Sequence, residues 1–440
     1  MLSCCLLLLL SLLTTALGDL ELYQRGGFPQ AEKIFNSCFF WSTNKNPRFL
    51  TLAHHWDAPI PTEVIRVQLE KVFSFESEFY LRTYDPEGVV FYGDANNGNN
   101  WFVLALRHGR PEIQISNQYC HLVVSSGNVL NDGRWRKIAV RSQEDVIVLT
   151  VDDQIALVIA IVPSIGLDNS MENMRIAMGG LLINESSLLV PLRHSLDACI
   201  MNWNWLQQNT SWIKEKVARN PNLQCHTEIT TGSFFPGVGM AVFRCSDLLN
   251  ASEAEPSWSL RFEVVIRPKK HNGLVMALLT GEHDPLLKLQ FSLQDTHEQF
   301  KLSLGTETTI SIEGPARLCD GHHINLTISE SKATLQIGDQ HGRQRVHASD
   351  FAALKTSWFK GDTLMFLGGL PGLDKLGYDW YVYAGCMQDI RLQGAAVDFN
   401  QVLFKHDSVS SHSCPAPKQS SSPSIDAGGF TQPKTKEFRK

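Results

Sequence analysis

Two carboxylates at a predicted turn are the first residues of this sequence that could bind a metal ion. Asp85 and Glu87 flank a proline and precede Gly88, in the order Asp-Pro-Glu-Gly. Acidic side chains two residues apart at a turn can converge on one hard cation such as Ca²⁺, with carbonyls and waters filling the remaining positions. The same four residues also form a solvated type I turn without metal. The residues alone therefore leave a calcium site and a plain turn as alternatives.

Catalytic signatures are absent from the sequence. It has no Gly-x-Ser-x-Gly, His-Glu-x-x-His or Cys/His signature. The pairs His54-His55 and His322-His323 would point to opposite faces of a strand, so they are poor metal pairs. A glycosidase built on a β-sandwich needs two carboxylates across a cleft, whereas the two carboxylates above share one turn. We therefore expect a binding protein and not an enzyme.

The composition limits the class of protein. The 440 residues include 39 Lys plus Arg and 45 Asp plus Glu, and the formal net charge is −6. That charge is too mild to suggest nucleic acid as a main partner. Hydrophobic residues make up 43% of the chain, which is enough for buried cores and excludes wholesale disorder. The length fits two or three domains of about 100–200 residues each.

The first eighteen residues have the pattern of an export signal. Residues 6–13 are apolar except for one serine, and residues 16–18 supply small side chains before a cleavage site. The pattern departs from the usual one because no Lys or Arg precedes the apolar run. The nearest later candidate for a membrane span, residues 146–162, is split by two aspartates. The sequence thus predicts a secreted, extracellular protein without a membrane span.

Cysteines and glycosylation signals agree with export. Eight cysteines follow residue 18, and an even number in an exported chain suggests disulfides. Four Asn-x-Ser/Thr sequons are possible glycosylation sites: Asn184, Asn209, Asn250 and Asn325. Asn325 lies within an apparent strand, where an edge or outer-face position could still carry a glycan.

Short β-strands must position these residues. Segments rich in aromatic and β-branched residues are separated by Gly, Pro, Asn and Asp, and residues 134–140 alternate polar and apolar as a half-buried strand does. Without helical patterns between them, such strands predict an antiparallel sandwich or barrel. One helix is expected at 209–219, capped by Asn209 or Thr210. The expected strands are 79–83, 88–92, 101–107, 112–115, 135–141 and 146–151.

The strand pattern occurs twice in the sequence. The segment 174–182 contains Gly-Gly-Leu-Leu and precedes Cys199, and the segment 363–371 contains Gly-Gly-Leu-Pro and precedes Cys386 at a similar distance. Each of these cysteines has a later partner candidate. We therefore predict two sandwiches of about 180 residues each, joined near residues 227–233.

Duplicated sandwiches with this Gly-Gly-Leu motif and these cysteines resemble laminin G-like domains. Within that family, the first copy is similar to secreted plasma carriers of sex steroids, and residues 75–200 carry the resemblance. It rests on 79–94, 101–102, 107–114, 132–135 and 174–182. The second copy is similar only in pattern, chiefly at 366–372, Cys386 and 412–415. The resemblance implies an all-β protein of two tandem laminin G-like antiparallel β-sandwiches, of the jelly-roll or concanavalin-like type.

The domain boundaries follow from the copies and their flanks. We expect the first laminin G-like domain, for steroid binding and dimerisation, at 65–226 and the second at 232–414. Before them lie the signal peptide, 1–18, and a segment whose structure the sequence does not indicate, 19–64. The end, 415–440, is rich in Pro, Ser, Gly and Lys and is expected to be disordered.

The resemblance implies a carrier of androgens and oestrogens, the testosterone, dihydrotestosterone and oestradiol class. One steroid would lie in an apolar slot between the sheets of the first domain, which would also form a homodimer. Ser77 stands where the family's serine meets the ring-A oxygen, and Asn117 where its asparagine meets the 17-hydroxyl. Asn100 replaces an aspartate and, unlike it, can both donate and accept a hydrogen bond. Phe102 and Met174 match apolar wall residues.

The resemblance also implies metal and disulfide sites. It places Ca²⁺ at Asp85 and Glu87, with the Ser195 carbonyl as a third ligand. Gln118 and Met171 stand where the carriers have zinc-binding histidines, and neither is a good zinc ligand, so no zinc site is predicted there. The implied disulfides are Cys199–Cys225 and Cys386–Cys414, and the pairing of Cys38, Cys120, Cys245 and Cys319 stays open.

Departures from the carriers leave a second hypothesis open. Ala95 replaces a threonine beside the slot, and Ser142 replaces a methionine of its wall. The alternative is an extracellular adhesion or receptor-ligand module without steroid binding, because pairs of laminin G-like domains also serve in that role. Those relatives usually carry γ-carboxyglutamate or EGF modules, which this sequence does not show.

Overall fold

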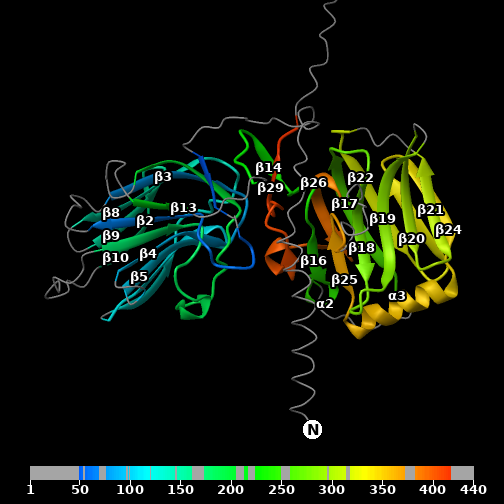
Figure 1. The fold of residues 1–440 in the computed structure, drawn as a ribbon, viewed down its shortest axis with the longest axis horizontal. Helices are drawn as coiled ribbons and strands as arrows, with labels where there is room; N and C mark the ends of the chain where they lie inside the picture. Colours follow the sequence, from blue (N-terminus) through cyan, green and yellow to red (C-terminus); the bar gives the residue numbers. More distant parts are fainter. Residues whose placement is uncertain are drawn as a thin grey trace, which may run out of the picture.

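The computed structural model contains two β-sandwiches that lie side by side (Figure 1). It describes residues 49–52, 55–68, 76–95, 98, 100–118, 120–143, 146–160, 173–204, 213–216, 223–248, 258–294, 297–313, 318–371 and 382–417. The described chain is built chiefly of strands, as the turn-punctuated pattern predicts. Among these residues, no helix is long and apolar enough to cross a membrane.

The first sandwich packs a six-stranded sheet against a seven-stranded sheet, and all neighbouring strands are antiparallel. The six-stranded sheet has the order β1 (Phe49–Thr51), β12 (Ala198–Asn204), β3 (Glu76–Thr83), β8 (Arg136–Gln143), β9 (Val146–Val151) and β10 (Gln154–Ala160). The seven-stranded sheet has the order β13 (Ile213–Lys216), β2 (Glu63–Gln68), β11 (Asn173–Met178), β4 (Gly88–Ala95), β5 (Asn100–Arg107), β6 (Arg110–Ser116) and β7 (His121–Ser125).

The second sandwich repeats this plan. One sheet has the order β15 (Ser233–Pro236), β26 (Ala384–Leu392), β17 (Leu260–Pro268), β22 (His322–Ile328), β23 (Lys332–Ile337) and β24 (Gln340–Arg345), with β27 (Ala395–Ala396) beside β26. The other has the order β21 (Thr308–Glu313), β20 (His297–Leu304), β19 (Pro285–Gln294), β18 (Gly273–Leu279), β25 (Leu364–Leu367), β16 (Ala241–Arg244) and β28 (Phe404–Lys405). Two helices accompany it, α2 (Cys245–Leu248) and α3 (Ala348–Lys360), and α3 runs along one end of the sandwich (Figure 1). The predicted fold class, two tandem antiparallel sandwiches, is confirmed.

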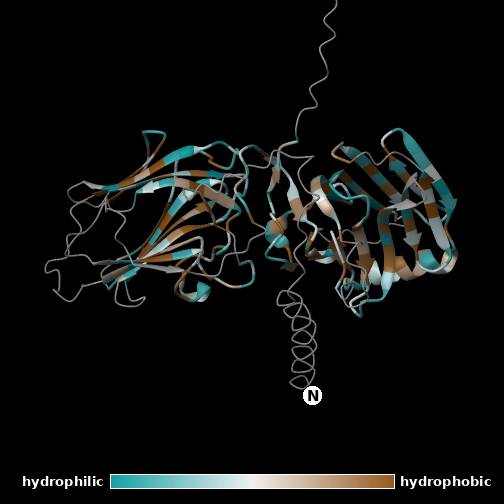
Figure 2. Cartoon of the chain, turned by 45° about the horizontal axis from the view of Figure 1, so that its top comes forward, coloured by the Kyte–Doolittle hydropathy of each residue, from teal (hydrophilic) through white to brown (hydrophobic). Residues whose placement is uncertain are grey.

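Alternating polarity along the strands builds the two cores. Figure 2 shows hydrophobic and hydrophilic residues alternating along the strands of both sandwiches. Along β17 the burial pattern is strictly alternating, as a strand with one face on the core requires. In the first sandwich the seven-stranded sheet is covered on its outer face too, because Leu181, Leu188 and Leu192 pack with Tyr92 and Trp101 there.

A buried ion pair fixes the register of β4 and β11. Arg175 donates from Nε to Oδ1 of Asp94 at 2.8 Å and from a terminal nitrogen to Oδ2, and Tyr92 donates to the same Oδ2 at 2.9 Å. Asp94 is 1% exposed. Burial first, and then the adjacent carboxylate, raise the pKa of Tyr92, so the hydroxyl keeps its proton and the carboxylate keeps its donor.

A small sheet and two disulfides tie the chain together at the junction. β14 (Ile229–Thr231) pairs with β29 (Ser413–Pro415). The implied disulfides Cys199–Cys225 and Cys386–Cys414 are present. Of the four cysteines whose pairing stayed open, Cys120 and Cys245 are free and Cys319 is disulfide-bonded, while Cys38 lies outside the described residues.

Two segments differ from the sequence-based expectation. The prediction of a helix at 209–219 is wrong within the described residues. Ile213–Lys216 forms strand β13, and all of β13 pairs with β2. The backbone there gains partners from a free sheet edge, which outweighs local helix propensity. No structure was predicted for the segment 19–64. In the structure this segment contributes β1 and the start of β2 to the first sandwich.

Candidate functional site

Topology brings the predicted slot residues to one end of the first sandwich. The Asp85–Glu87 turn joins β3 to β4, so the start of β3 and the end of β4 lie together at the opposite end. Ser77 is the second residue of β3, and Ala95 is the last residue of β4. At about 3.3 Å per residue, an eight-residue strand separates the two ends by roughly 25 Å. The candidate slot and the candidate calcium turn therefore occupy opposite ends of the same sandwich.

The seven-stranded sheet contributes one wall of this end. Its register pairs Met174 with Ala95, and Ala95 with Asn100, so the three residues form one row across three strands. The next row pairs Phe102 with Gly93 on one side and with Ile115 on the other. Because side chains alternate between faces, both rows point toward the six-stranded sheet together with the buried core residues of β4 and β5.

Ser77 faces that wall from the six-stranded sheet. It pairs with Val140 of β8 and is 8% exposed. Two positions along the same face, Phe79 meets Phe91 edge to face at 5.8 Å, and Phe91 meets Phe102 in the same way at 5.8 Å. This chain of aromatic contacts joins the two sheets beside the candidate slot.

The layer between the sheets is only half-buried at its periphery. Apolar side chains that pack on the buried core but keep partial exposure come from both sheets: Phe102, Ile115, Leu122, Val124, Val140, Ile147, Ala156, Met174 and Trp203. The centre of the same core is closed, for example at Phe79 and Leu149, which are 0% exposed. A partly exposed apolar rim of this kind can cover a flat apolar ligand and so remove the ligand's surface from water.

Asn117 closes the turn between β6 and β7. Its side-chain oxygen accepts from the Cys120 backbone N–H at 2.8 Å, and its own N–H donates to the Cys120 carbonyl at 2.9 Å. Trp101 of β5 pairs with Ser116 of β6. Asn100, the first residue of β5, and Asn117, the residue after β6, therefore lie at the same end of the sheet. The two candidate polar contacts are thus brought together, with part of the Asn117 hydrogen-bonding capacity already used in the turn.

Gly93 is a slot feature that the sequence analysis missed. A Cβ built on Gly93 would lie 2.3 Å from two atoms of the Phe102 ring, so the ring occupies the space that any side chain would need. A glycine inside a strand signals a close approach of this kind. Among the noted departures, Ala95 is buried in the wall, whereas Ser142 and Gln118 are exposed; Met171 lies outside the described residues.

The Asp-Pro-Glu-Gly turn lies against the second domain. Asp85 is 2% exposed, and its carboxylate accepts from the backbone N–H groups of Asp197 at 2.9 Å and Glu87 at 3.1 Å. The side chains of His412 and Asn400 approach it at 3.4 and 3.3 Å. Burial by itself would raise the pKa of Asp85, but His412 and the backbone donors hold it below its ordinary value.

The three candidate calcium ligands line one cavity of about 560 Å³ between the domains. Glu87 and the Ser195 segment reach it from the first domain, together with Glu185. Carboxylate and carbonyl oxygens are the donor types that Ca²⁺ prefers, and a carboxylate oxygen that accepts a hydrogen bond still has a lone pair for a cation. In the part of the chain that the structure describes, no three His, Cys, Asp or Glu side chains form a metal-binding group. Carbonyl and water oxygens would therefore complete the coordination.

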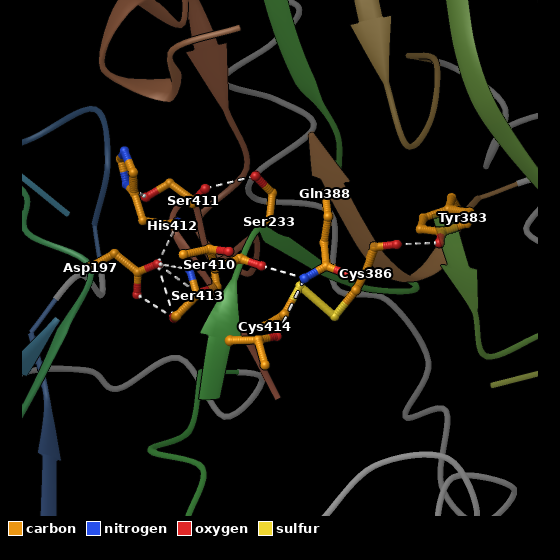
Figure 3. The surroundings of a disulfide bond; sticks show 12 residues. Asp197, Ser233, Tyr383, Cys386, Gln388, Ser410, Ser411, His412, Ser413 and Cys414 are labelled. Carbon is orange, nitrogen blue, oxygen red and sulfur yellow. Dashed lines mark hydrogen bonds between the residues drawn. A yellow bond between two sulfur atoms is a disulfide. The ribbon is translucent and has the colours of Figure 1, made fainter. Parts of the chain in front are cut away.

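Asp197 joins the two domains. Its carboxylate accepts from Ser410 Oγ at 2.7 Å, from the His412 backbone N–H at 2.8 Å and from the Ser413 backbone N–H at 3.1 Å (Figure 3). The acceptor belongs to the first domain and all three donors to the second. The adjacent Cys386–Cys414 disulfide holds this donor segment on β26.

Two of the four sequons lie within the described residues. Asn184 is exposed and caps a short 3₁₀ helix, Glu185–Ser187, by accepting from the Ser186 N–H at 3.0 Å. Asn325 is exposed on β22, on the outer face of the second sandwich, where a glycan would not meet the core. Asn209 and Asn250 lie outside the described residues.

Comparison with known proteins places both sandwiches in one family. The laminin G domain model matches residues 81–211, and a second laminin G domain model matches residues 266–395. The chain belongs to the laminin G domain family. Its two laminin G domains also match the mouse laminin α1 chain domains LG4-5, with a TM-score of 0.57 at 19% identity, covering 89% of this chain and 100% of that one. That likeness concerns the fold alone.

Several named relatives match most of the chain. Rabbit (Oryctolagus cuniculus) sex hormone-binding globulin is 32% identical over 356 residues, covering 81% of this chain and 85% of the relative. Human sex hormone-binding globulin is 33% identical over 357 residues, covering 81% and 84%. Mouse growth arrest-specific protein 6 is 30% identical over 395 residues, which is 86% of this chain. The chain spans only 58% of that last relative's length.

A buried neutral histidine predicts the pH dependence of the second laminin G domain. Burial lowers the pKa of His406 from 6.5 to about 4, and its Nδ1 accepts from the Ser408 N–H at 3.1 Å. As the pH falls, His406 takes up a proton in the unfolded chain before it does so in the folded chain. The contribution of the neutral His406 to stability is therefore fully present above pH 6.5 and is lost as the pH falls toward 4. We expect the free energy of unfolding to fall by up to about 1.4 kcal/mol per pH unit from this group.

Urea unfolding at pH 7.5, 6 and 5 checks this dependence. His406→Gln should flatten the decline, whereas His341→Gln, at an exposed position of β24, should leave it unchanged. Equal slopes for His406→Gln and the unmodified chain would contradict the assignment.

Proposed function

We propose that the first laminin G domain binds androgens and oestrogens between its sheets, and that the chain carries them outside the cell. The observation that supports this most is the half-buried apolar rim between Phe102 and Val140, with Ser77 on one sheet and Asn100 on the other. The similarity to sex hormone-binding globulins over most of the chain supports the same class of ligand. Disulfides and the export-type leader sequence favour an extracellular location.

The proposed slot has the chemistry that a steroid requires. A steroid is a flat hydrocarbon with a polar group at each end, and burying about 250–300 Å² of it is worth roughly 6–8 kcal/mol before the costs of binding. Ser77 can donate to a 3-keto oxygen or accept from a 3-hydroxyl, so it suits both steroid classes. Asn100 and Asn117 would meet the 17-oxygen from the opposite wall. This is binding chemistry, with no reaction step to assign.

A homodimer through the first domain is part of the proposal. β10 ends the strand order of the six-stranded sheet, and its residues Ile155 and Val158 are 69% and 50% exposed. An edge strand with exposed apolar side chains favours pairing with another strand. The partner we propose is β10 of a second copy, which would bury both residues.

Calcium at the interdomain turn is the third part of the proposal. Asp85, Glu87 and the Ser195 carbonyl would hold it, and it would neutralise acidic groups where the two domains meet. Its role would be structural, since the slot lies at the other end of the sandwich.

Steroid binding is tested by equilibrium dialysis of tritiated testosterone, dihydrotestosterone and oestradiol against the secreted protein. Saturable nanomolar binding is expected, and Ser77→Ala should weaken it about ten-fold, because a buried steroid oxygen then loses its partner. Ser126→Ala, at an exposed position after β7, is the matched control and should bind as the unmodified protein does. No saturable binding, with calcium or without it, would contradict the carrier function and favour the adhesion or receptor-ligand alternative.

Calcium binding is tested by thermal unfolding in excess CaCl₂ and in EDTA. Calcium at a hundred times its dissociation constant should stabilise the chain by about 2.7 kcal/mol and so raise the unfolding midpoint. Glu87→Gln should reduce that rise, and Glu330→Gln, on an exposed loop of the second domain, should not. Identical midpoints in CaCl₂ and EDTA would exclude a calcium site in the native chain.

Dimerisation is tested by light scattering coupled to size-exclusion chromatography at micromolar concentration. The unmodified chain should elute at twice its monomer mass, and Val158→Lys should halve the mass by placing charges at the proposed edge. Val129→Lys alters a residue of similar exposure, 47%, in a loop and should stay dimeric. A monomeric unmodified chain would refute the dimer.

A further inference from the structure

Strand β12 contains a bulge beside the proposed slot. Met201 pairs with Tyr80 and Asn204 pairs with Glu78, so two residues of β12, Asn202 and Trp203, lie opposite one residue of β3. Asn202 has φ 51°, a left-handed conformation that asparagine adopts more readily than most residues. An extra residue in one strand, with a local twist, is the geometry of a β-bulge.

The bulge reverses which side chain faces the core. In a regular strand Ile200 and Asn202 would share the inner face, and Trp203 would point outward with Met201. The structure shows the opposite: Asn202 is exposed, and Trp203 is half-buried and packs on the core between the sheets. Simple alternation read from the sequence would therefore place this indole on the wrong face.

The indole lies at the Ser77 end of the sandwich. Its neighbour Asn204 pairs with Glu78, which directly follows Ser77 in β3. Trp203 belongs to the same half-buried rim as Val140, the cross-strand partner of Ser77. The register places Trp203 opposite Phe79, which is two positions from Ser77 on the same inner face of β3. At that diagonal separation a large aromatic side chain can reach the hydroxyl that is proposed to meet the ring-A oxygen.

We infer that Trp203 forms a wall of the steroid slot and contacts ring A, which makes it a specificity-determining residue. The inference rests on the proposed function. Tryptophan removes a large apolar area from water, and aromatic pairs gain additional energy from edge-to-face or offset stacking. Oestradiol has an aromatic ring A, whereas that of dihydrotestosterone is saturated. The indole therefore favours oestrogens relative to saturated androgens.

The experiment compares oestradiol and dihydrotestosterone affinities of Trp203 variants in the full chain. Trp203→Ala should weaken both ligands about ten-fold or more. Trp203→Leu keeps apolar contact but no ring, so it should weaken oestradiol about 2- to 10-fold more than dihydrotestosterone. Trp135→Leu is the control, because Trp135 packs on Arg82 (4.5 Å) and on Phe49 away from the slot, and it should leave the ratio of the two affinities unchanged.

A second pair of variants tests the bulge itself. Asn202→Val disfavours positive φ and should reproduce the loss seen in Trp203→Ala, whereas Asn202→Gly permits it and should lose less. Urea unfolding identifies any variant that fails to fold, and the conclusion then rests on the Trp203→Leu ratio.

The outcomes separate this inference from the proposed function. If the unmodified chain binds neither steroid, the proposed function fails and the inference with it. If it binds both and Ser77→Ala weakens them, but Trp203→Leu leaves the ratio unchanged, the slot stands and the role of Trp203 is overturned.

Discussion

The Asp94–Arg175 ion pair is the interaction on which the proposed slot depends. It joins β4 to β11 on the outer face of the sheet, and the register that it fixes places Met174 beside Ala95 on the inner face. Asp94 is fully buried, and removing one partner of a buried pair typically costs about 3–5 kcal/mol, because the other charge is left without compensation. A polar contact on the outer face of the sheet thereby fixes which apolar residues are neighbours on the inner face.

The two ends of the first sandwich are built differently. At the end of the proposed slot the sheets meet through half-buried apolar side chains. At the other end the Asp85 and Asp197 carboxylates accept a dense set of hydrogen bonds, several from the second domain. Charge-assisted hydrogen bonds of this kind hold geometry well, so the second domain braces one end of the sandwich, and the proposed slot lies at the other end.

Much of the architecture could be predicted from the sequence because period-two alternation and turn residues are local signals. Each of the six strands expected between residues 79 and 151 overlaps an observed strand. The same locality explains the failure at 213–216, where pairing with β2 overrides a pattern that favoured a helix. Asp85 is buried against His412, which lies far from it in the sequence. No local pattern could predict that contact.

By itself, the sequence determined the fold class, the duplication, the two disulfide pairs implied by the resemblance, and the residue types that could meet a steroid. The fold class and the duplication depend on short-range order, which a chain carries before it folds, whereas the disulfide pairs and the candidate contact residues rest on the resemblance to the family. Only the tertiary structure decided that Ser77 and Asn100 share one end, that Gly93 makes room for Phe102, and that Trp203 faces inward. Such facts depend on register and on a single bulge, and a shift of one residue moves a side chain to the other face of the sheet.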